Sequence, residues 1–291
     1  MVNKNLGLVL EGGGMRGAYT SGVLEAFMDE DIRFPYVIGV SAGANSGASY
    51  ISEQRGRNKK VFVDYVTHKE YSGFRHLIKA RSYFNMDFLF NKIPNHLEPF
   101  DYEKFFNSPT KFKVCITDSQ TGQPVYFEKS QAKDGKFMNQ VLRASSSLPI
   151  ISPPVELNGR LYFDGGITDA IPLEKSIEDG NKHNVVILTR NEGYLKQEER
   201  LGFYSRNYLR KYPKILKAIK ERHIKYNNTL EKIKTLEKEG YVYVFRPIAP
   251  LVVDRLEKDS LKLNQLYEQG RREAVEQMDS FIKWLTNIIE D

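Results

Sequence analysis

The chain contains very little cysteine and no long uninterrupted apolar segment. Cys115 is the single cysteine among 291 residues, so an intramolecular disulfide is excluded. Cys115 lies in the apolar run Phe112–Ile116, which predicts a buried strand, and we expect its thiol to pack in a core rather than to catalyse. No stretch approaches the roughly 18 uncharged apolar residues that a membrane-spanning helix requires. The scarcity of cysteine is consistent with a reducing compartment.

The first residues also lack the features of a secretory signal. Gly and Glu interrupt the apolar run within about ten residues, so a continuous hydrophobic region does not form. We therefore expect a cytoplasmic protein that touches a membrane only at its surface. Histidine is scarce as well: the five histidines show no spacing typical of metal ligands, and we expect neither a metal nor another cofactor.

Charge of one sign is in slight excess, and it is unevenly distributed. The formal net charge is +6, and basic side chains greatly outnumber acidic ones between Arg206 and Lys238. Two interpretations of this stretch stay open: a helical pair packed on the core, or a surface that contacts anionic lipid headgroups. No helix-turn-helix, zinc or RNA-binding pattern accompanies the charge, so nucleic acid is not expected as a partner. The helical spacing of the stretch predicts an apolar face formed by Leu209, Ile215, Leu216, Ile219, Ile224, Leu230 and Ile233.

The most informative motif is centred on Ser41. Gly39-Val40-Ser41-Ala42-Gly43 directly follows the apolar stretch Tyr36–Ile38. This G-x-S-x-G pattern is typical of a nucleophile elbow, in which a serine occupies a tight strand-to-helix turn with its hydroxyl exposed at the end of a sheet. Glycines suit such a turn because they lack Cβ atoms. Ser41 is therefore a candidate nucleophile.

A glycine-rich loop precedes this motif. Glu11–Gly17 follows the expected strand 6–10 and leads into a helical pattern. Such a strand-to-helix loop points backbone N–H groups outward, and the helix N-terminus adds partial positive charge. The loop is therefore expected to stabilise an anion, either a phosphate or the oxyanion of an attacked ester.

A third motif, Asp164-Gly165-Gly166, lies downstream. Asn158-Gly159 predicts a two-residue hairpin turn before it, so Asp164 is expected at the end of a strand. A carboxylate in this position suits a general base, and it equally suits the cap of a turn.

Together these motifs resemble those of the patatin-like phospholipase family. The resemblance covers roughly residues 5–190 and implies a three-layer α/β/α sandwich with a mainly parallel central sheet. The segments that carry it are G-G-G-x-R-G at Gly12–Gly17, G-x-S-x-G at Gly39–Gly43, D-G-G at Asp164–Gly166, and an A-S-x-x-x-P segment at Ala144–Pro149.

The resemblance also implies a function: a serine acyl hydrolase that cleaves carboxylic ester bonds of (phospho)lipids without a cofactor. In this reading a lipid ester is the substrate, and contact with an anionic membrane surface is peripheral. Arg16 either meets a phosphate or packs against the glycine loop. The residues that match the family's functional positions are Ser41 as nucleophile, Asp164 as base, and Gly12, Gly13 and Gly14 as oxyanion hole.

Periodicity predicts one domain, residues 1–291, with a core of about 5–190, a basic helical region of about 200–240, and a strand and a helix in 241–291. Segment 58–107 is expected to cover the site, with lid or pocket candidates Phe84, Met86, Phe88, Leu89 and Phe90. The expected strands are 6–10, 35–40, 111–118, 124–128, 184–190 and 241–246, with a hairpin at 155–163. The expected helices are 16–30, 42–54, 136–145, 172–179 and 255–289.

Three other hypotheses stay open. Gly12-x-Gly14-x-x-Gly17 also fits a dinucleotide fingerprint, but the second strand ends in serine rather than in the acidic residue that binds a ribose. An α/β-hydrolase triad would need His183 or His223, and we expect His183 to be exposed ahead of its strand. The third hypothesis is a non-catalytic lipid-binding or regulatory protein on the same fold; the intact motifs argue against it.

Overall fold

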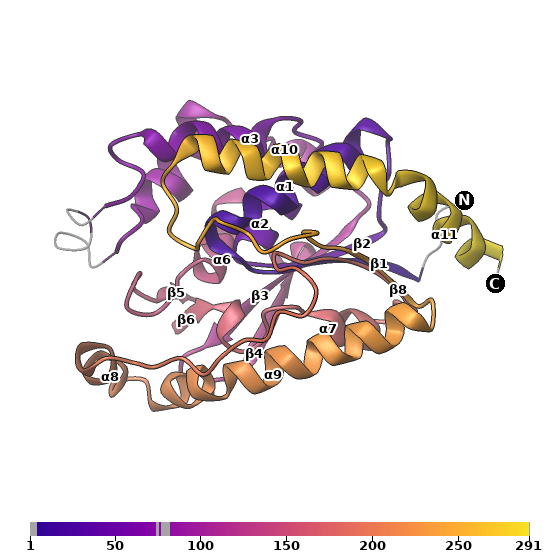
Figure 1. Ribbon diagram of the computed structural model, residues 1–291. Helices are drawn as coiled ribbons and strands as arrows, with labels where there is room; N and C mark the ends of the chain where they lie inside the picture. The colour runs from indigo at the N-terminus through magenta and orange to yellow at the C-terminus, as the bar shows by residue number, and fades with distance from the viewer. Residues whose placement is uncertain (1–4, 74–75, 77–81, 291) are drawn as a thin grey trace.

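The structure is a computed structural model that describes residues 5–73, 76 and 82–290. It places one sheet between two layers of helices, so the three-layer α/β/α sandwich is confirmed (Figure 1). Residues 74–75 and 77–81, which belong to the expected covering segment, lie outside the described residues.

The sheet is mainly parallel at its centre. Its strands run in the order β5-β6-β3-β2-β1-β7-β8, and β4 pairs with β3. The four pairings from β3 through β2, β1 and β7 to β8 are parallel, whereas β4 and β6 run antiparallel to β3. Every residue of β1, β2 and β7 is buried, as expected for strands covered on both faces. The strands are β1 (Leu6–Leu10), β2 (Tyr36–Val40), β3 (Lys111–Asp118), β4 (Pro124–Glu128), β5 (Val155–Leu157), β6 (Arg160–Asp164), β7 (His183–Ile187) and β8 (Val242–Phe245).

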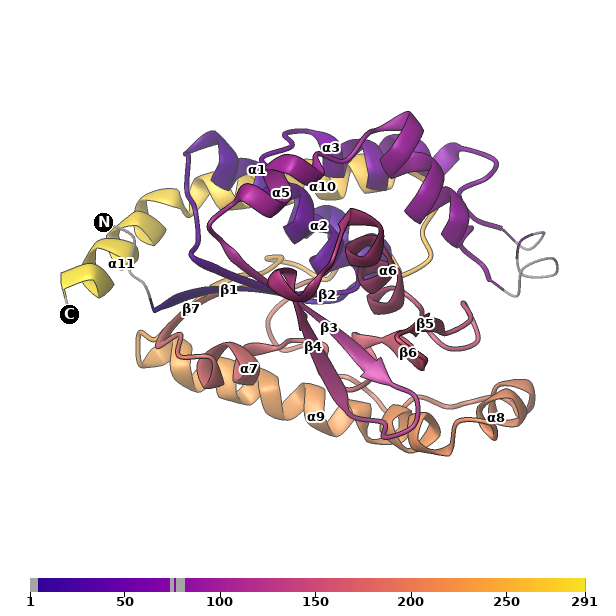
Figure 2. The same ribbon diagram turned by 180° about the vertical axis from the view of Figure 1, so that it is seen from behind.

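The helices divide unequally between the two faces. Figures 1 and 2 show α1, α2, α3, α5, α6 and α10 over one face, and α7 and α9 over the other. Helix α11 lies at the end of the molecule where β1 begins, and α8 lies at the opposite end. The helices are α1 (Gly17–Asp29), α2 (Ala42–Ile51), α3 (Arg57–Lys59), α5 (Tyr102–Asn107), α6 (Gly135–Ser145), α7 (Leu173–Glu178), α8 (Phe203–Leu209), α9 (Pro213–Lys238), α10 (Ser260–Glu276) and α11 (Met278–Glu290), with a π-helical segment at Phe88–Leu97.

Helix α10 packs very closely on α1, although the two are far apart in sequence. A Cβ atom on Gly22 would lie 2.0 Å from the Tyr267 carbonyl oxygen, and one on Gly270 would lie 2.2 Å from the Tyr19 carbonyl oxygen. The Tyr19 hydroxyl also donates a 2.8 Å hydrogen bond to the buried Glu273 carboxylate. The two glycines therefore set the distance between the helices, and a carboxylate–phenol pair fixes their register.

Several expected boundaries were wrong. The single helix expected at 255–289 is two helices, α10 and α11, because Asp259 caps α10 and Gln277 separates the pair. The expected strand 184–190 is β7, which ends at Ile187. The apolar face expected at 209–233 is divided between α8, which holds the buried Leu209, and the basic helix α9. On α9, Ile215, Ile219 and Ile233 are buried, Leu216 and Leu230 are partly buried, and Ile224 is 52% exposed. Helix propensity and spacing alone do not reveal where tertiary contacts end an element.

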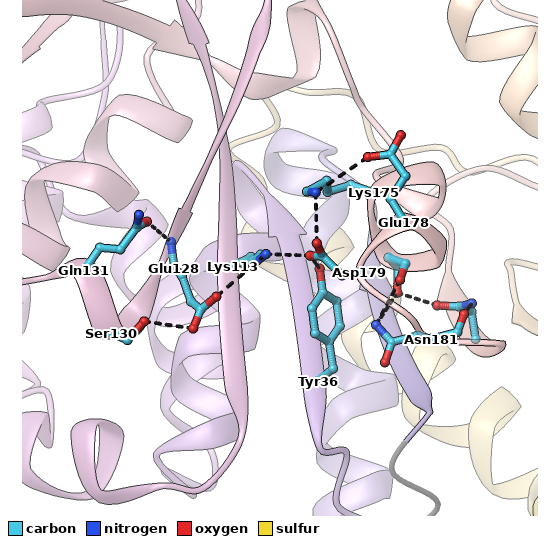
Figure 3. Close-up of polar contacts among 11 residues, drawn as sticks. Tyr36, Lys113, Glu128, Ser130, Gln131, Lys175, Glu178, Asp179 and Asn181 are labelled. Atoms are coloured by element: carbon cyan, nitrogen blue, oxygen red, sulfur yellow. Dashed lines mark hydrogen bonds and ion pairs between the residues drawn. The ribbon is translucent and has the colours of Figure 1, made fainter.

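At the start of the parallel strands, a set of polar side chains joins the sheet to α7 (Figure 3). Asp179 accepts hydrogen bonds from the Tyr36 hydroxyl at 2.7 Å, from Lys113 Nζ at 2.6 Å and, as an ion pair, from Lys175 Nζ at 2.8 Å. Burial raises the pKa of Asp179, but hydrogen bonds from Lys113, Lys175 and Tyr36 outweigh it and lower that pKa to about 2. We call these four residues the Asp179 network.

Candidate active site

Ser41 lies between the end of β2 and the start of α2, where the sequence places a nucleophile elbow. Its φ is 52° and its ψ is −120°, an uncommon conformation for a residue with a Cβ atom. A Cβ on Gly43 would lie 2.6 Å from the Leu10 carbonyl oxygen, so the turn requires glycine there. The Ser41 residue is 8% exposed. The elbow expected from the sequence is therefore present, with its serine at the edge of a covered site.

Two serines at the C-terminal end of α6 hold the elbow in place. Ser145 Oγ accepts a 2.8 Å hydrogen bond from the Ser41 N–H and donates one of 2.7 Å to the Cys115 carbonyl. The Asn45 side-chain amide donates to the Ser41 carbonyl at 2.8 Å and to Ser146 Oγ at 2.9 Å. The Ala144–Pro149 segment thus satisfies the Ser41 N–H of the strained turn, and Ser146 positions the Asn45 amide that satisfies the Ser41 carbonyl.

The pairing of the strands places Asp164 near Ser41 at the same edge of the sheet. Val40 pairs with Cys115 on β3, and the next β3 residue, Ile116, pairs with Asp164 on β6. Asp164 is 2% exposed, and its Oδ1 accepts a 2.7 Å hydrogen bond from the Gly166 N–H. The Ser41 side chain is close enough to the Asp164 carboxylate to lower its pKa.

Burial raises the pKa of Asp164 above that of an exposed aspartate. The positive charge of Arg222, the nearby Ser41 side chain and the hydrogen bond from Gly166 each oppose this rise. The carboxylate is therefore more basic than an ordinary aspartate, which is the property that a proton acceptor needs near neutral pH.

The glycine loop lies beside the elbow, but its three glycines differ in what their N–H groups do. The Gly12 N–H donates a 3.1 Å hydrogen bond to the Ala170 carbonyl, so it is already engaged. The Gly13 and Gly14 N–H groups have no such acceptor among the described residues. Gly14 has a φ of +58°, and a Cβ there would lie 2.7 Å from the Arg255 carbonyl oxygen. Within the described residues, Gly13 and Gly14 are therefore candidate donors of this loop.

A pocket of about 1150 Å³, which includes its open mouth, has Ser41 in its wall. Most of the wall is apolar and comes from segment 58–107, from α6 and from Met15. Four of the five lid or pocket candidates line it, whereas Phe88 is buried beside it and stacks on His68. An apolar cleft next to a serine fits an acyl chain. The four candidates are Phe84, Met86, Leu89 and Phe90.

Arg16, whose role the sequence left open, is a buried residue with 4% exposure. Burial and the charge of Arg190 lower its pKa to about 10, and Glu11 opposes this. Its Nε has no hydrogen-bond partner among the described residues. Arg16 is therefore a buried cation of the loop, and it lies close to other cations of the chain.

Three of these cations were not predicted as site residues: Lys196, Arg222 and Arg255. Arg222 and Arg255 both act electrostatically on Asp164, and Arg255 lines the pocket that contains Ser41. The position of Arg222 could have been noticed in the sequence. Helical spacing places it on the same face of α9 as Ile219 and Tyr226, which are both buried. Arg255 and Lys196 lie in irregular segments and carry no periodic signal.

The histidines of the alternative triad are not beside Ser41. His183 is 5% exposed, not exposed as expected, because it starts β7 and is paired with Leu6 at the opposite end of β1 from the glycine loop. His223 Nδ1 forms a 2.8 Å hydrogen bond with the Lys220 carbonyl of its own helix. Within residues 5–73, 76 and 82–290, no group of three or more His, Cys, Asp or Glu side chains is arranged to hold a metal ion. No helix in the same residues has the length and apolar character needed to cross a bilayer.

Comparison with known proteins adds relatives of this chain. It is 33% identical over 189 residues to the uncharacterized protein YjjU of Escherichia coli (strain K12), covering 63% of this chain and 52% of that protein. It is 27% identical over 209 residues to lysophospholipase NTE1 of Cryptococcus neoformans var. neoformans, covering 64% of this chain and 11% of that protein. The chain therefore spans about half of the first relative and a small part of the second.

The crystal structure of VipD from Legionella pneumophila has the same fold, with a TM-score of 0.54 and 13% identity, over 96% of this chain and 67% of that one. A domain of unknown function (DUF6363) matches residues 212–286. The family model described as patatin-like phospholipase matches residues 8–176, which contain Ser41, Asp164 and the glycine loop. The chain belongs to the patatin-like phospholipase family.

Proposed function

We propose that the protein is a lipid acyl hydrolase that cleaves carboxylic ester bonds through a Ser41–Asp164 dyad. The observation that carries this proposal is a strained serine, close enough to a buried aspartate to lower its pKa, in the wall of an apolar pocket. Membership of the patatin-like phospholipase family and similarity to a lysophospholipase support a lipid ester as the substrate.

In the proposed reaction, Ser41 Oγ attacks the ester carbonyl while Asp164 accepts the hydroxyl proton. The N–H groups of Gly13, Gly14 and Ala42 hold the developing oxyanion, and each such donor contributes about 3 kcal/mol in enzymes where one has been removed. The Ala42 N–H is available because it belongs to the first turn of α2. Gly12 shapes the loop and does not donate, since its N–H is bonded to Ala170.

When the tetrahedral intermediate collapses, the bond to the alcohol breaks and the proton held by Asp164 passes to the leaving alkoxide. A water molecule then attacks the acyl-serine ester, and Asp164 accepts its proton. The second collapse releases the fatty acid and returns the proton to Ser41. The dry surroundings raise the pKa of Asp164 and so favour the two steps in which Asp164 accepts a proton.

A fluorophosphonate label tests the dyad directly. Intact and peptide mass should show one adduct, on Ser41, and the Ser41→Ala variant should show none. Ser130→Ala is the matched control, because Ser130 is an exposed serine that hydrogen-bonds Glu128 far from the pocket. An adduct on another serine, or none on the folded protein, contradicts the proposal and favours a lipid-binding protein.

Peripheral membrane contact is part of the proposal. Helix α8 leaves Phe203 and Tyr204 77% and 88% exposed, and the basic helix α9 follows it. Exposed aromatic rings beside basic side chains suit the boundary of an anionic bilayer. The protein should sediment together with phosphatidylglycerol vesicles. The double variant Phe203→Ser, Tyr204→Ser should stay in the supernatant. Equal binding to phosphatidylcholine vesicles would contradict an electrostatic contribution.

A further inference from the structure

The apolar pocket that contains Ser41 also contains a buried positive charge that the hydrolytic reaction does not use. Among the described residues that line the pocket, the charged side chains are Arg57 and Arg255, and none is a carboxylate. Arg255 lies at the Gly14 end, where a Cβ on Gly14 would contact its backbone. Arg57 belongs to a different part of the wall, at the start of α3. Arginine is rarely fully buried unless it is paired, so a lone guanidinium in a mostly apolar wall is unusual.

Arg57 lies at the far end of the pocket from Ser41. Helix α2 begins directly after Ser41, and one of its faces lines the pocket from Ala42 to Ala48. Arg57 Nη1 donates a 3.1 Å hydrogen bond to Ser49 Oγ, in the last turn of the same helix. Ser49 is eight residues after Ser41, or roughly 12 Å along the helix axis. The guanidinium therefore lies at a depth that only a longer acyl chain on Ser41 can reach.

The contacts of Arg57 leave much of its hydrogen-bonding capacity unused. Its residue is 9% exposed, and its guanidinium carbon lies 5.0 Å from the centre of the Phe100 ring. Nη2 donates a long hydrogen bond of 3.4 Å to the Glu98 carbonyl, and the buried Nε has no hydrogen-bond partner among the described residues. A guanidinium carries five N–H donors. The two Nη contacts engage two of these donors, so three have no acceptor within the described part of the chain.

The charge of Arg57 is not compensated by an ion pair either. In the described part of the chain no carboxylate forms an ion pair with it, and the Glu98 carboxylate, which acts on it electrostatically, is paired with Lys60 Nζ at 2.9 Å. Burial lowers the pKa of Arg57 to about 10, and the charge of Glu98 opposes this. Arg57 is therefore a cation at neutral pH whose acidic neighbour already has a partner.

A second donor lies at the same end of the pocket. Tyr102, the first residue of α5, lines the pocket, and its hydroxyl interacts electrostatically with Arg57. Its ring is held against α6, because a Cβ on Gly135 would clash with it. Helices α3 and α5 both contact α2, so the two side chains come from neighbouring elements (Figure 2). A hydroxyl beside a guanidinium is a combination of donors that suits a carboxylate.

We propose that Arg57 and Tyr102 bind a carboxylate at the distal end of the acyl chain, so that the enzyme prefers esters whose acyl group ends in a carboxylate. The inference rests on the proposed function. In this arrangement the ester carbonyl lies at Ser41, the methylene groups contact the apolar wall, and the distal carboxylate accepts hydrogen bonds from the guanidinium and the phenol. Such substrates are half-esters of dicarboxylic acids, the class that oxidation of the methyl end of a fatty acyl chain supplies.

Two esters of equal chain length isolate the contribution of the distal carboxylate: 1-(7-carboxyheptanoyl)glycerol and 1-octanoylglycerol, both used as monomers. The kcat/KM of the wild type should be at least about tenfold higher for the carboxylated ester, as charge-assisted hydrogen bonds imply. A pocket without a usable cation should show the opposite preference, because a carboxylate loses its hydration there. The shorter pair 1-(3-carboxypropanoyl)glycerol and 1-butanoylglycerol should show no preference for the carboxylate, since that chain does not reach Arg57.

Substitutions at the two donors test the assignment. Arg57→Gln and Tyr102→Phe should each lower the ratio of the two kcat/KM values for the longer pair by roughly tenfold. Tyr102→Phe keeps the ring packing, so it remains informative if Arg57→Gln does not fold. Arg55→Gln is the matched control, because Arg55 pairs with Asp29, has a side chain that is 53% exposed and does not line the pocket. This variant loses one positive charge and should keep the wild-type ratio.

Two results overturn the inference. The first is a wild-type ratio of one or below for the longer pair. The second is a ratio that stays at the wild-type value in folded Arg57→Gln and in Tyr102→Phe.

Free octanoate separates two sources of a carboxylate at Arg57, a substituent on the substrate and a fatty acid bound in the reverse orientation. If the site serves the substrate, octanoate should inhibit competitively only at concentrations well above the KM of the carboxylated ester. Strong competitive inhibition by octanoate together with a substrate ratio of one would identify a site for free fatty acid and would overturn the substrate assignment.

Binding can also be measured apart from catalysis. Ser41→Ala keeps the pocket and lacks the nucleophile, so titration calorimetry of this variant gives Kd values for both esters. The Kd of the carboxylated ester should be at least about tenfold lower than that of 1-octanoylglycerol, and adding Arg57→Gln should remove the difference. If the wild type hydrolyses neither ester and Ser41 takes no fluorophosphonate label, the proposed function fails; the Kd values still decide whether Arg57 binds the carboxylate.

Discussion

The Asp179 network and the cations beside Asp164, namely Arg16, Lys196 and Arg222, are both partly buried groups of charges, yet they are built in opposite ways. In the Asp179 network each charged group faces an opposite charge or a donor, and the carboxylate has three donors (Figure 3). Among the cations beside Asp164, like charges face one another, and in the described part of the chain the Nε atoms of Arg16 and Arg222 lack a hydrogen-bond partner. The charges of the first group are compensated within the group, whereas those of the second group are not.

The effect on two lysines shows the difference most clearly. The pKa of Lys175 is raised, mainly by its hydrogen bond to Asp179. The pKa of Lys196 is lowered to about 7 by burial and by neighbouring arginines. A charge whose pKa shift stabilises the folded state contributes to stability. A charge whose pKa shift destabilises the folded state is more typical of a functional site. Substitutions in the two regions should therefore separate stability from function.

The largest difference is expected between the two aspartates. Asp164→Asn removes the proton acceptor and should lower kcat/KM by at least about a thousandfold while the protein stays folded. Hydrolysis of 1-hexanoylglycerol and circular dichroism measure the two effects. Asp179→Asn is the matched control and should hydrolyse the ester at a rate close to that of the wild type. Near-normal turnover by Asp164→Asn would end the dyad hypothesis.

The second effect concerns stability. Asp179→Asn should lower the free energy of unfolding at pH 7 by about 2 kcal/mol, because hydrogen bonds to a charged group are lost. Folding lowers the pKa of Asp179 to about 2, so its ionised carboxylate stabilises the protein above a pH of about 4 and this contribution is lost as the pH falls toward 2. Urea unfolding at several pH values should show wild type and variant converging in acid. A difference independent of pH would show that the Asp179 charge is not its source.

The third effect is a shift in the pH profile. Asp164 must be ionised to accept a proton, so kcat/KM falls as the pH drops through its pKa. The positive charge of Arg222 lowers that pKa, and Arg222→Gln should therefore move the acid limb of the profile to higher pH. The neutral ester 1-hexanoylglycerol is the substrate of choice, and Lys220→Gln is the control. An unchanged acid limb would place Arg222 outside electrostatic reach of the base.

The smallest effect compares the two lysines. Lys175→Gln should lower the free energy of unfolding by about 0.5 kcal/mol, since a partly exposed ion pair is lost. Lys196→Gln should instead raise Tm, because it removes a charge whose pKa is lowered by folding. The gain should be larger at pH 6, where Lys196 is charged in the folded protein, than at pH 9. Calorimetry of both variants measures this, and a lower Tm for Lys196→Gln would show that its charge is already compensated.

The parts of the molecule that were predictable from sequence are those encoded locally. The sandwich, most strand positions and the elbow at Ser41 follow from short motifs whose glycines and hydrophobic runs admit few conformations. The position of Asp164 was predictable to the end of a strand, because Asn158-Gly159 fixes the hairpin before it. Its proximity to Ser41 follows from strand register across β3, which no local pattern encodes.

The unpredictable parts depend on distant contacts. Nothing near Arg255 indicates that its carbonyl binds the Met15 N–H, and the close contact of Gly22 with Tyr267 joins residues that no periodicity relates. The exposure of Ile224 and the break at Gln277 likewise depend on how α9, α10 and α11 meet the rest of the fold. Arg222 was the one missed site residue with a usable signal, a charge on an apolar helical face.

The contact between Met15 and Arg255 bears on how the protein is made in the cell. A ribosome releases the glycine loop before residues 255–276, so the loop cannot gain its Arg255 partner, nor α1 its cover by α10, until α10 has emerged. The nascent protein therefore carries Ser41 long before its surroundings are complete. The site proposed at Ser41 can form only after α10 has been synthesised.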